Sequence, residues 1–164
     1  MSEKKNGPTT GSAGASTVCR GIRGATQAAG NEREAILSAT RTLLREIVAA
    51  NVIEPEDIAS IFFTATPDLD AACPPLAARQ LGWTLVPLLG AQEIDFAGSL
   101  PRTIRVLLHC NTTRSQAEMR HIYINGAEVL RPDLAPLPID TNAGTPESMA
   151  VATPGATHKG ESSS

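Results

Sequence analysis

The sequence is poor in aromatic residues and has no long apolar run. Aromatic side chains make up 3% of the 164 residues, so a core would be built mainly from Leu, Ile, Val and Ala. No apolar stretch approaches the roughly 20 residues needed to span a bilayer. The N-terminal segment has basic residues without an apolar run after them, so the pattern of a secretory signal is absent.

Cysteine is also scarce. The chain has three cysteines, Cys19, Cys73 and Cys110, and no two of them have the CxxC spacing. An odd number without paired spacing argues against a disulfide framework and against a zinc site. We therefore expect reduced thiols and a cytoplasmic protein.

Positive charge is limited in amount but unusual in kind. The net charge is −3 and no basic run exceeds two residues, which argues against binding to nucleic acid or to an anionic membrane. Between Val18 and Leu134 there are eleven arginines and no lysine. Codon bias can account for that ratio, but it does not account for where the individual arginines lie.

The composition predicts one folded domain between two flexible ends. Residues 1–17 have no large apolar residue after Met1, which predicts a disordered tail. Residues 135–164 are rich in Pro, Gly and Ser and predict a second flexible tail. The folded body is expected to cover residues 18–134.

Strand and helix patterns alternate within this body and predict a mixed α/β domain of the α+β class. A helix is expected at 32–50, capped by Asn31 with Glu34 three residues later. A second helix is expected from Pro74 or Pro75 to Leu81, and a brief one at 115–119. Strands are expected at 18–25, 58–66, 84–89, 104–110, 121–124 and 128–130, the last two flanking a tight turn at Asn125-Gly126.

Two main helices cannot cover both faces of such a sheet. We therefore expect the other face to pack against a second subunit. The segment 104–110 is almost wholly apolar, as a strand covered on both faces would be.

The usual signatures of covalent or cofactor chemistry are missing. His109, Cys110 and His121 do not have a recognised metal-ligand spacing. The expected folded body, residues 18–134, contains no GxSxG, SxxK or Cys–His signature of a nucleophile and no glycine-rich phosphate loop. We therefore expect neither a metal nor a cofactor.

Arginines at the ends of predicted elements are the most informative feature. Any one of them could be an ordinary surface residue. Four in one small domain suggest a site that binds carboxylates with two hydrogen bonds each, because the planar guanidinium matches a carboxylate. The four are Arg23, Arg79, Arg105 and Arg131.

The stretch RGIRGAT shows the argument at the level of one strand. Arg20 and Arg23 are three residues apart, so in a strand their side chains point to opposite faces. Two further polar residues lie in or just after predicted strands, Glu93 and Tyr123. The ordinary interpretation of these two is a solvated loop carboxylate and a buried tyrosine whose hydroxyl is satisfied.

Four motifs together resemble the AroH class of monofunctional chorismate mutases. They occur in the expected order and span about residues 20–134: RGIRGAT, TATPDLDAACPPLAARQLGW, VPLLGAQEIDFAGSLPRTIRVLL and RHIYINGAEVLRPDL. The resemblance implies conversion of chorismate to prephenate, on the route to phenylalanine and tyrosine, without a cofactor. It also implies a ferredoxin-like subunit of the chorismate mutase II type, forming a trimeric pseudo-α/β barrel with active sites at the subunit interfaces.

The resemblance also implies roles for particular residues. Arg105 would hydrogen-bond the ether oxygen of the breaking bond and a carboxylate, and Arg23 would bind a carboxylate. Glu93 would hold the ring hydroxyl, and Tyr123 would help to bind a carboxylate.

Three more residues would lie around the mouth of the site. Arg131 and Arg79 would attract or bind the dianion there, and Leu130 would form an apolar wall. Ala135 and the residues after it could fold over the site as a lid, although a disordered tail remains the alternative.

Three substrate-site positions depart from the best-known members of the class. Cys73, Leu76 and Gly90 stand where those members have Phe, Lys and Cys. Loss of the Lys removes a positive charge at the entrance, and loss of the Cys removes a contact near the ring hydroxyl. These departures bear on substrate affinity more than on the reaction itself.

Two other functions remain open on the sequence alone. One is a trimeric small-metabolite binder or an imine deaminase of the RidA type, which would need an arginine for one carboxylate. The other is an inactive or regulatory paralogue with a degraded pocket. Turnover of chorismate by the purified protein would separate all three.

Overall fold

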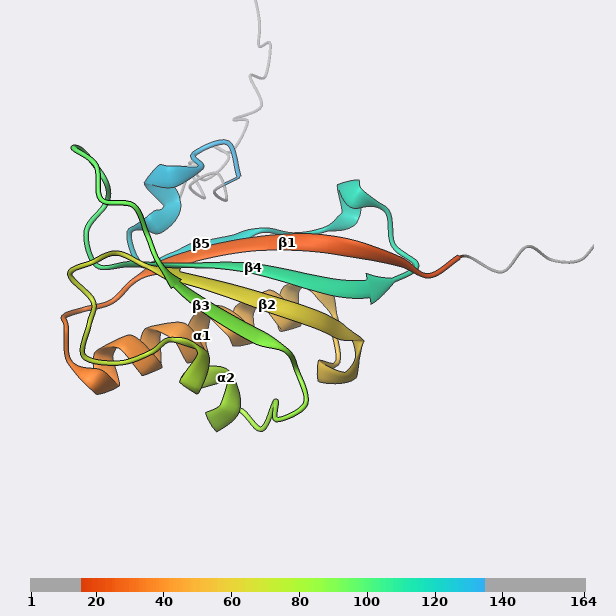
Figure 1. Ribbon diagram of the computed structural model, residues 1–164. Coiled ribbons are helices and arrows are strands. Elements are labelled where there is room, and N and C mark those ends of the chain that lie inside the picture. The colour runs from red at the N-terminus through yellow and green to blue at the C-terminus, as the bar shows by residue number, and fades with distance from the viewer. Residues whose placement is uncertain (1–15, 135–164) are drawn as a thin grey trace, which may run out of the picture.

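The computed structural model describes residues 16–134. The predicted tails, apart from residues 16 and 17, and the possible lid from Ala135 onward lie outside this range. Within it the chain forms a five-stranded mixed sheet with two α-helices on one of its faces (Figure 1). This agrees with the predicted α+β class. Neither helix combines the length and apolar character needed to cross a membrane.

The sheet is ordered β3-β2-β4-β1-β5, with β4 at its centre. β4 is antiparallel to both β1 and β2, while β5 is parallel to β1 and β3 is parallel to β2. The segment β1-α1-β2 is therefore a split β-α-β unit with β4 inserted between its strands, as in ferredoxin-like folds. The strands are β1 (Val18–Gln27), β2 (Ile58–Ala65), β3 (Leu88–Gln92), β4 (Thr103–Thr112) and β5 (Ile122–Ile124).

The long helix α1 (Arg33–Asn51) and the short helix α2 (Pro75–Gln80) lie against the same face of the sheet. Apolar residues recur along one side of α1 at helical spacing, and that side packs on the strands. The core is aliphatic, as the composition predicts, with a few aromatic residues such as Phe63. α1 contributes to it the buried aliphatic residues Ile36, Leu37, Leu43, Leu44 and Ile47.

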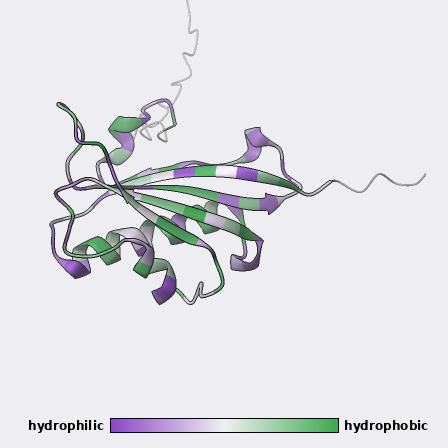
Figure 2. Cartoon of the chain, viewed as in Figure 1, coloured by the Kyte–Doolittle hydropathy of each residue, from purple (hydrophilic) through white to green (hydrophobic). Residues whose placement is uncertain are grey.

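Side-chain alternation separates a helix-covered face of the sheet from an open face. On β4 the residues Val106 and Leu108 are buried beneath the helices, whereas Arg105, Leu107 and His109 point the other way. Neither α1 nor α2 covers that second face, although the residues that follow β5 pack over Ala25 at one end of it. The expected cover of this face of β4 by a second subunit stays a prediction. Hydropathy along the strands is mixed accordingly (Figure 2).

The expected cap of the first helix is wrong. The N-cap residue of α1 is Glu32, whose side chain makes no capping hydrogen bond. The Asn31 side chain instead accepts hydrogen bonds from the backbone N–H groups of Asp70 and Ala71, at 2.9 and 3.1 Å. Asn31 thus fastens the loop between β2 and α2, a use that a local capping pattern cannot distinguish from a cap.

The strand predicted at 84–89 is displaced toward the C-terminus. Leu85 is 94% exposed and Val86 is buried in the core before the strand begins. Pairing with β2 starts where Ile61 N–H donates to the carbonyl of Pro87, at 2.9 Å, and β3 then runs through Leu88–Gln92. Its LLGAQ sequence has weak strand propensity, so pairing with β2 defines the strand.

The strand predicted at 128–130 is a short 3-10 helix, Ala127–Leu130. The tight turn before it is confirmed, because Asn125 and Gly126 both have positive φ, at 55° and 93°. The residue that follows, Ala127, packs beside Tyr123. Burial of this alanine turns the chain back over the sheet edge, so within residues 16–134 β1 is the one strand that pairs with β5.

Candidate active site

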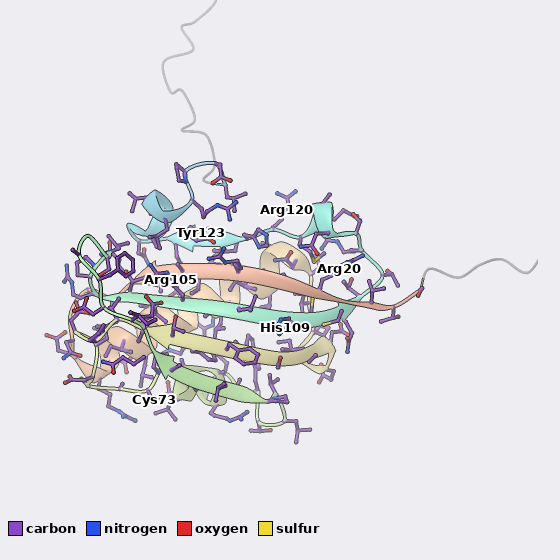
Figure 3. The ribbon with its side chains drawn as sticks, turned by 45° about the horizontal axis from the view of Figure 1, so that its top comes forward. Arg20, Cys73, Arg105, His109, Arg120 and Tyr123 are labelled. Carbon is purple, nitrogen blue, oxygen red and sulfur yellow. The ribbon has the colours of Figure 1, made fainter. Side chains whose placement is uncertain are left out.

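A polar row crosses the open face near one end of the sheet. The strand registers place Tyr123 beside Ala25, Ala25 beside Arg105, Arg105 beside Thr64, and Thr64 beside Ala91. These five residues come from five different strands and lie side by side. Figure 3 looks onto this face, with Arg105 and Tyr123 toward one end of the sheet and His109 and Arg20 toward the other.

Glu93 joins this row from just beyond the end of β3. It is two residues after Ala91, so it returns to the open face, and its backbone N–H donates to the carbonyl of Ala65 at 2.9 Å. One Glu93 oxygen forms an ion pair with Arg105, and the other accepts a hydrogen bond from the Thr64 hydroxyl at 2.5 Å. The Glu93 side chain is only 12% exposed, so both carboxylate oxygens have donors in a largely buried setting.

Arg23 lies two residues before Ala25 on the same face of β1, diagonal to Arg105. Burial, and after it the positive charge of Arg23, lowers the pKa of Arg105, while nearby Tyr123 opposes this. The ion pair with Glu93 favours the charged guanidinium, so Arg105 remains a cation. Two arginines and one carboxylate leave one positive charge unbalanced in this cluster, which favours an anionic ligand.

Tyr123 presents a buried hydroxyl without a partner. Its side chain packs with Ala25, Ala127 and Leu130. Among residues 16–134 no group makes a hydrogen bond of acceptable geometry with its hydroxyl, although the Arg131 guanidinium is close enough to interact with it. A buried polar group without a hydrogen bond is costly and uncommon. This hydroxyl is therefore available to a ligand on the open face.

Arg131 lies close to this hydroxyl but already has a partner. Its guanidinium donates two hydrogen bonds to the Asp133 carboxylate, at 2.9 and 2.8 Å. The hydrogen bond with Asp133 is the main cause of a raised pKa for Arg131, and nearby Tyr123 adds to it. Any ligand carboxylate would compete with Asp133 for this arginine.

The opposite orientation of Arg20 and Arg23 is confirmed. Arg23 shares the open face with Gly21, where an added Cβ would contact Leu107 and His109. Arg20 is on the helix-covered face, and its Nε donates to the carbonyl of Arg114 at 3.0 Å. The partner of Arg20 is therefore a backbone carbonyl.

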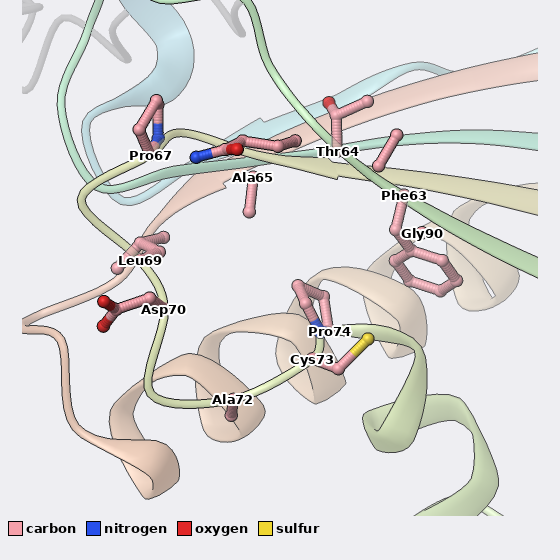
Figure 4. Close-up of a pocket in the computed structure, with 12 residues that line it drawn as sticks. Phe63, Thr64, Ala65, Pro67, Leu69, Asp70, Ala72, Cys73, Pro74 and Gly90 are labelled. Atoms are coloured by element: carbon pink, nitrogen blue, oxygen red, sulfur yellow. The ribbon is translucent and has the colours of Figure 1, made fainter.

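The predicted substrate residues of the second helix and β3 lie elsewhere. Gly90 faces the helix-covered side, where an added Cβ would lie 3.2 Å from the nearest carbon of Pro75 and 3.6 Å from the Cys73 sulfur. Cys73 and Gly90 line a pocket of about 390 Å³ under the β2 and β3 ends, shown in Figure 4. Thr64 and Ala91 of the polar row also line this pocket, whereas Arg23, Arg105, Glu93 and Tyr123 do not.

Leu76 and Arg79 belong to α2, beside this pocket. The backbone N–H of Leu76 donates to the carbonyl of Cys73 at 3.1 Å. The exposed Arg79 donates to the carbonyl of Trp83. One chain therefore brings together Arg23, Arg105, Glu93, Tyr123, Leu130 and Arg131, but it places the other four predicted residues on the helix side.

Sequence reasoning did not identify two residues that contact this cluster. Thr64 holds Glu93, and His121 Nδ1 accepts the backbone N–H of Arg23 at 3.0 Å. Thr64 lies in the motif TATPD, yet its partner is visible only once β2 and β3 are in register. His121 was considered only as a metal ligand, and its contact depends on the parallel pairing of β5 with β1.

The chain matches known proteins over the same region. The family model of chorismate mutase type I matches residues 19–134. The match carries the designation type I, whereas the sequence-based expectation named a chorismate mutase II fold type. The chain is 50% identical to chorismate mutase AroH of Thermus thermophilus over 118 residues, which is 71% of this chain and 97% of that protein.

Two further relatives agree with this match. The chain is 44% identical to chorismate mutase AroH of Bacillus subtilis over 119 residues, 72% of this chain and 94% of that protein. The solved chorismate mutase of Clostridium thermocellum superposes with a TM-score of 0.66 and 47% identity, covering 66% of this chain and 97% of that one. The chain therefore belongs to the chorismate mutase type I family, in its AroH class.

Proposed function

We propose that the chain isomerises chorismate to prephenate at the polar row of the open face. The reaction breaks one C–O bond and forms one C–C bond within the same molecule, so it needs no proton transfer and no covalent intermediate. Catalysis then requires holding the flexible dianion in its compact conformer and stabilising the charge that develops. The observation that carries the proposal is the set of Arg23, Arg105, Glu93 and the unpartnered Tyr123 hydroxyl on one surface.

Each of these groups has a task in this proposal. Arg105 donates to the ether oxygen, which gains negative charge as the C–O bond stretches, and its five N–H donors also allow contact with a carboxylate. Arg23 and Tyr123 bind a carboxylate and fix the conformer. Glu93 accepts a hydrogen bond from the ring hydroxyl and stabilises positive charge that develops on the ring.

Two neighbouring groups complete this part of the site. Leu130 packs on Tyr123 and provides an apolar wall. Arg131 attracts the dianion at the mouth of the site and then exchanges its hydrogen bonds to Asp133 for hydrogen bonds to a substrate carboxylate. Its role is in binding, so we expect it to affect KM more than kcat.

The site is shared between subunits in this proposal. Cys73, Leu76 and Arg79 lie in or just before α2, on the helix side of the sheet, so in this proposal a second copy brings its own set of them to the cluster. Gly90 adjoins Ala91 of the polar row and can serve the site of its own chain. The open face supports such an assembly, because its apolar residues Phe62, Leu89 and Leu107 are 42%, 56% and 38% exposed in the single chain. We propose a homotrimer with ferredoxin-like subunits around a pseudo-α/β barrel, acting in the cytoplasm.

A mixing experiment tests the shared site. Arg105→Ala and Arg79→Ala subunits would be dissociated, mixed and reassembled, with each variant reassembled alone as the control. Sites that combine an intact Arg105 from one copy with an intact Arg79 from another would restore activity at chorismate concentrations far below KM. A mixture no more active than the average of its components contradicts the shared site.

The activity is tested by incubating purified, metal-free protein with chorismate. We expect loss of chorismate absorbance and a matching amount of prephenate, without added cofactor. Tight binding without turnover would instead indicate an inactive paralogue. If the protein neither binds nor converts chorismate, the proposal is wrong. A binder or deaminase of the RidA type would need fewer cationic groups than this surface carries.

A further inference from the structure

Thr64 separates the two charged residues of the polar row. β2 lies between β4, which carries Arg105, and β3, which leads to Glu93. The register places Thr64 directly beside Arg105 on one side and Ala91 on the other. The side chain at this position of β2 therefore lies between Arg105 and Glu93, beneath their ion pair.

Glu93 is held at three points. Its backbone N–H is fixed by the carbonyl of Ala65, one carboxylate oxygen is bound by Arg105, and the other accepts the Thr64 hydroxyl at 2.5 Å. A carboxylate that is only 12% exposed depends on such donors, because a buried charge without hydrogen bonds is strongly disfavoured. Thr64 supplies a donor that is independent of Arg105.

This independence matters when substrate binds. Arg105 would have to turn toward the ether oxygen, and the Glu93 oxygen that it holds would then be free to accept the ring hydroxyl. The Thr64 hydroxyl has one hydrogen and gives it to Glu93. We propose that Thr64 is a positioning residue, which holds one oxygen of Glu93 while the other exchanges Arg105 for the substrate; this inference rests on the proposed function of the site.

Loss of this hydroxyl has two consequences. Glu93 would depend on Arg105 as its remaining side-chain donor, so the ion pair would tighten and Arg105 would be less free to reach the ether oxygen. The carboxylate would also lose a hydrogen bond that favours its charged form. Both effects act on the chemical step more than on initial binding.

The experiment compares Thr64→Val, which keeps the shape but removes the hydroxyl, with Thr64→Ser, which keeps the hydroxyl. For Thr64→Val we expect kcat to fall about tenfold, the factor typical of a hydrogen bond to a charged group. KM should stay within about twofold, and the acid limb of the kcat profile should move to higher pH. Thr64→Ser should recover most of kcat and the original acid limb.

Thr66→Val is the matched control. Thr66 is buried just after β2, and its hydroxyl oxygen accepts the backbone N–H of Thr103 at 2.9 Å, away from Glu93. We expect this variant to melt at a lower temperature without moving the acid limb. An equal displacement of that limb in Thr66→Val and Thr64→Val would overturn the inference, because it would mean that any loss of support in this segment has the same effect.

Glu93→Gln separates the inference from the function on which it rests. If Glu93→Gln keeps wild-type kcat, the assignment of Glu93 to the site is wrong. If Glu93→Gln is impaired while Thr64→Val keeps wild-type kcat and pH profile, only the role of Thr64 is wrong. If the role is correct, Thr64→Val should add little to Glu93→Gln, because Thr64 acts through Glu93.

Discussion

Arg105 and Glu93 form an ion pair across an intervening strand, with the Thr64 hydroxyl bound to the same carboxylate. Arg105 is on β4 and Glu93 follows β3, so their pairing depends on the order of the sheet. Without substrate the two side chains neutralise each other. In the proposed complex its partners separate in function, Arg105 serving the ether oxygen and Glu93 the ring hydroxyl.

Arg20 and Arg23 should behave as opposites. Arg23→Ala removes a proposed carboxylate ligand, and we expect kcat/KM for chorismate to fall about a hundredfold or more. Arg20→Ala loses its hydrogen bond to the Arg114 carbonyl, which should cost about 1 kcal/mol of folding free energy with little kinetic change. Steady-state kinetics and thermal unfolding check both variants. A larger loss of kcat/KM in Arg20→Ala than in Arg23→Ala would mean that Arg23 is not the arginine of the site.

Tyr123→Phe should separate stability from activity. The tyrosine hydroxyl is buried and has no hydrogen-bond partner among the described residues. Its removal should leave the free energy of unfolding unchanged or raise it by about 1 kcal/mol or less, while KM for chorismate rises several-fold. A marked loss of stability with unchanged KM would mean that the hydroxyl serves the fold and not the substrate.

Asp133→Asn should strengthen substrate binding. The Asp133 carboxylate holds the Arg131 guanidinium with two hydrogen bonds, and the neutral amide would release it more readily. We expect a lower KM with little change in kcat, whereas Arg131→Ala should raise KM. If both variants leave KM at the wild-type value, Arg131 does not act at the mouth of the site.

His121 should make the fold sensitive to acid. Burial, followed by the charges of Arg131 and Arg23, lowers the pKa of His121 below its ordinary value near 6.5. The unfolded chain then binds more protons than the folded one as pH falls from about 6.5, so stability is lost on acidification. Protonation of His121 also puts a proton on Nδ1, so this nitrogen can no longer accept the hydrogen bond from the backbone N–H of Arg23.

His121→Gln keeps an acceptor oxygen but cannot titrate. We expect its melting temperature to decrease less than that of the wild type between pH 7.5 and 5.5. Equal decreases in the two proteins would show that His121 does not contribute to the pH dependence.

Local pattern was sufficient for some of the site and not for the rest. The period of two in β1 correctly separated Arg20 from Arg23. That inference needs only one strand. The contact of Glu93 with Thr64 needs the parallel register of β2 and β3, which the weak LLGAQ strand does not reveal.

Long-range contacts also explain the structural errors. Asn31 has the sequence pattern of a helix cap, but the backbone of a distant loop takes its side chain. The segment after Gly126 has the composition of a strand, but burial of Ala127 beside Tyr123 makes it a short helix. In both places a tertiary partner overrides the local preference.

The most direct test is the kcat of Arg105 variants with purified, folded protein. Arg105→Ala should lose about 3 kcal/mol or more of transition-state stabilisation, by comparison with the loss of an oxyanion donor. Arg105→Lys should recover only part of this, because the charge remains but the planar arrangement of donors does not. A wild-type kcat in Arg105→Ala would contradict the account.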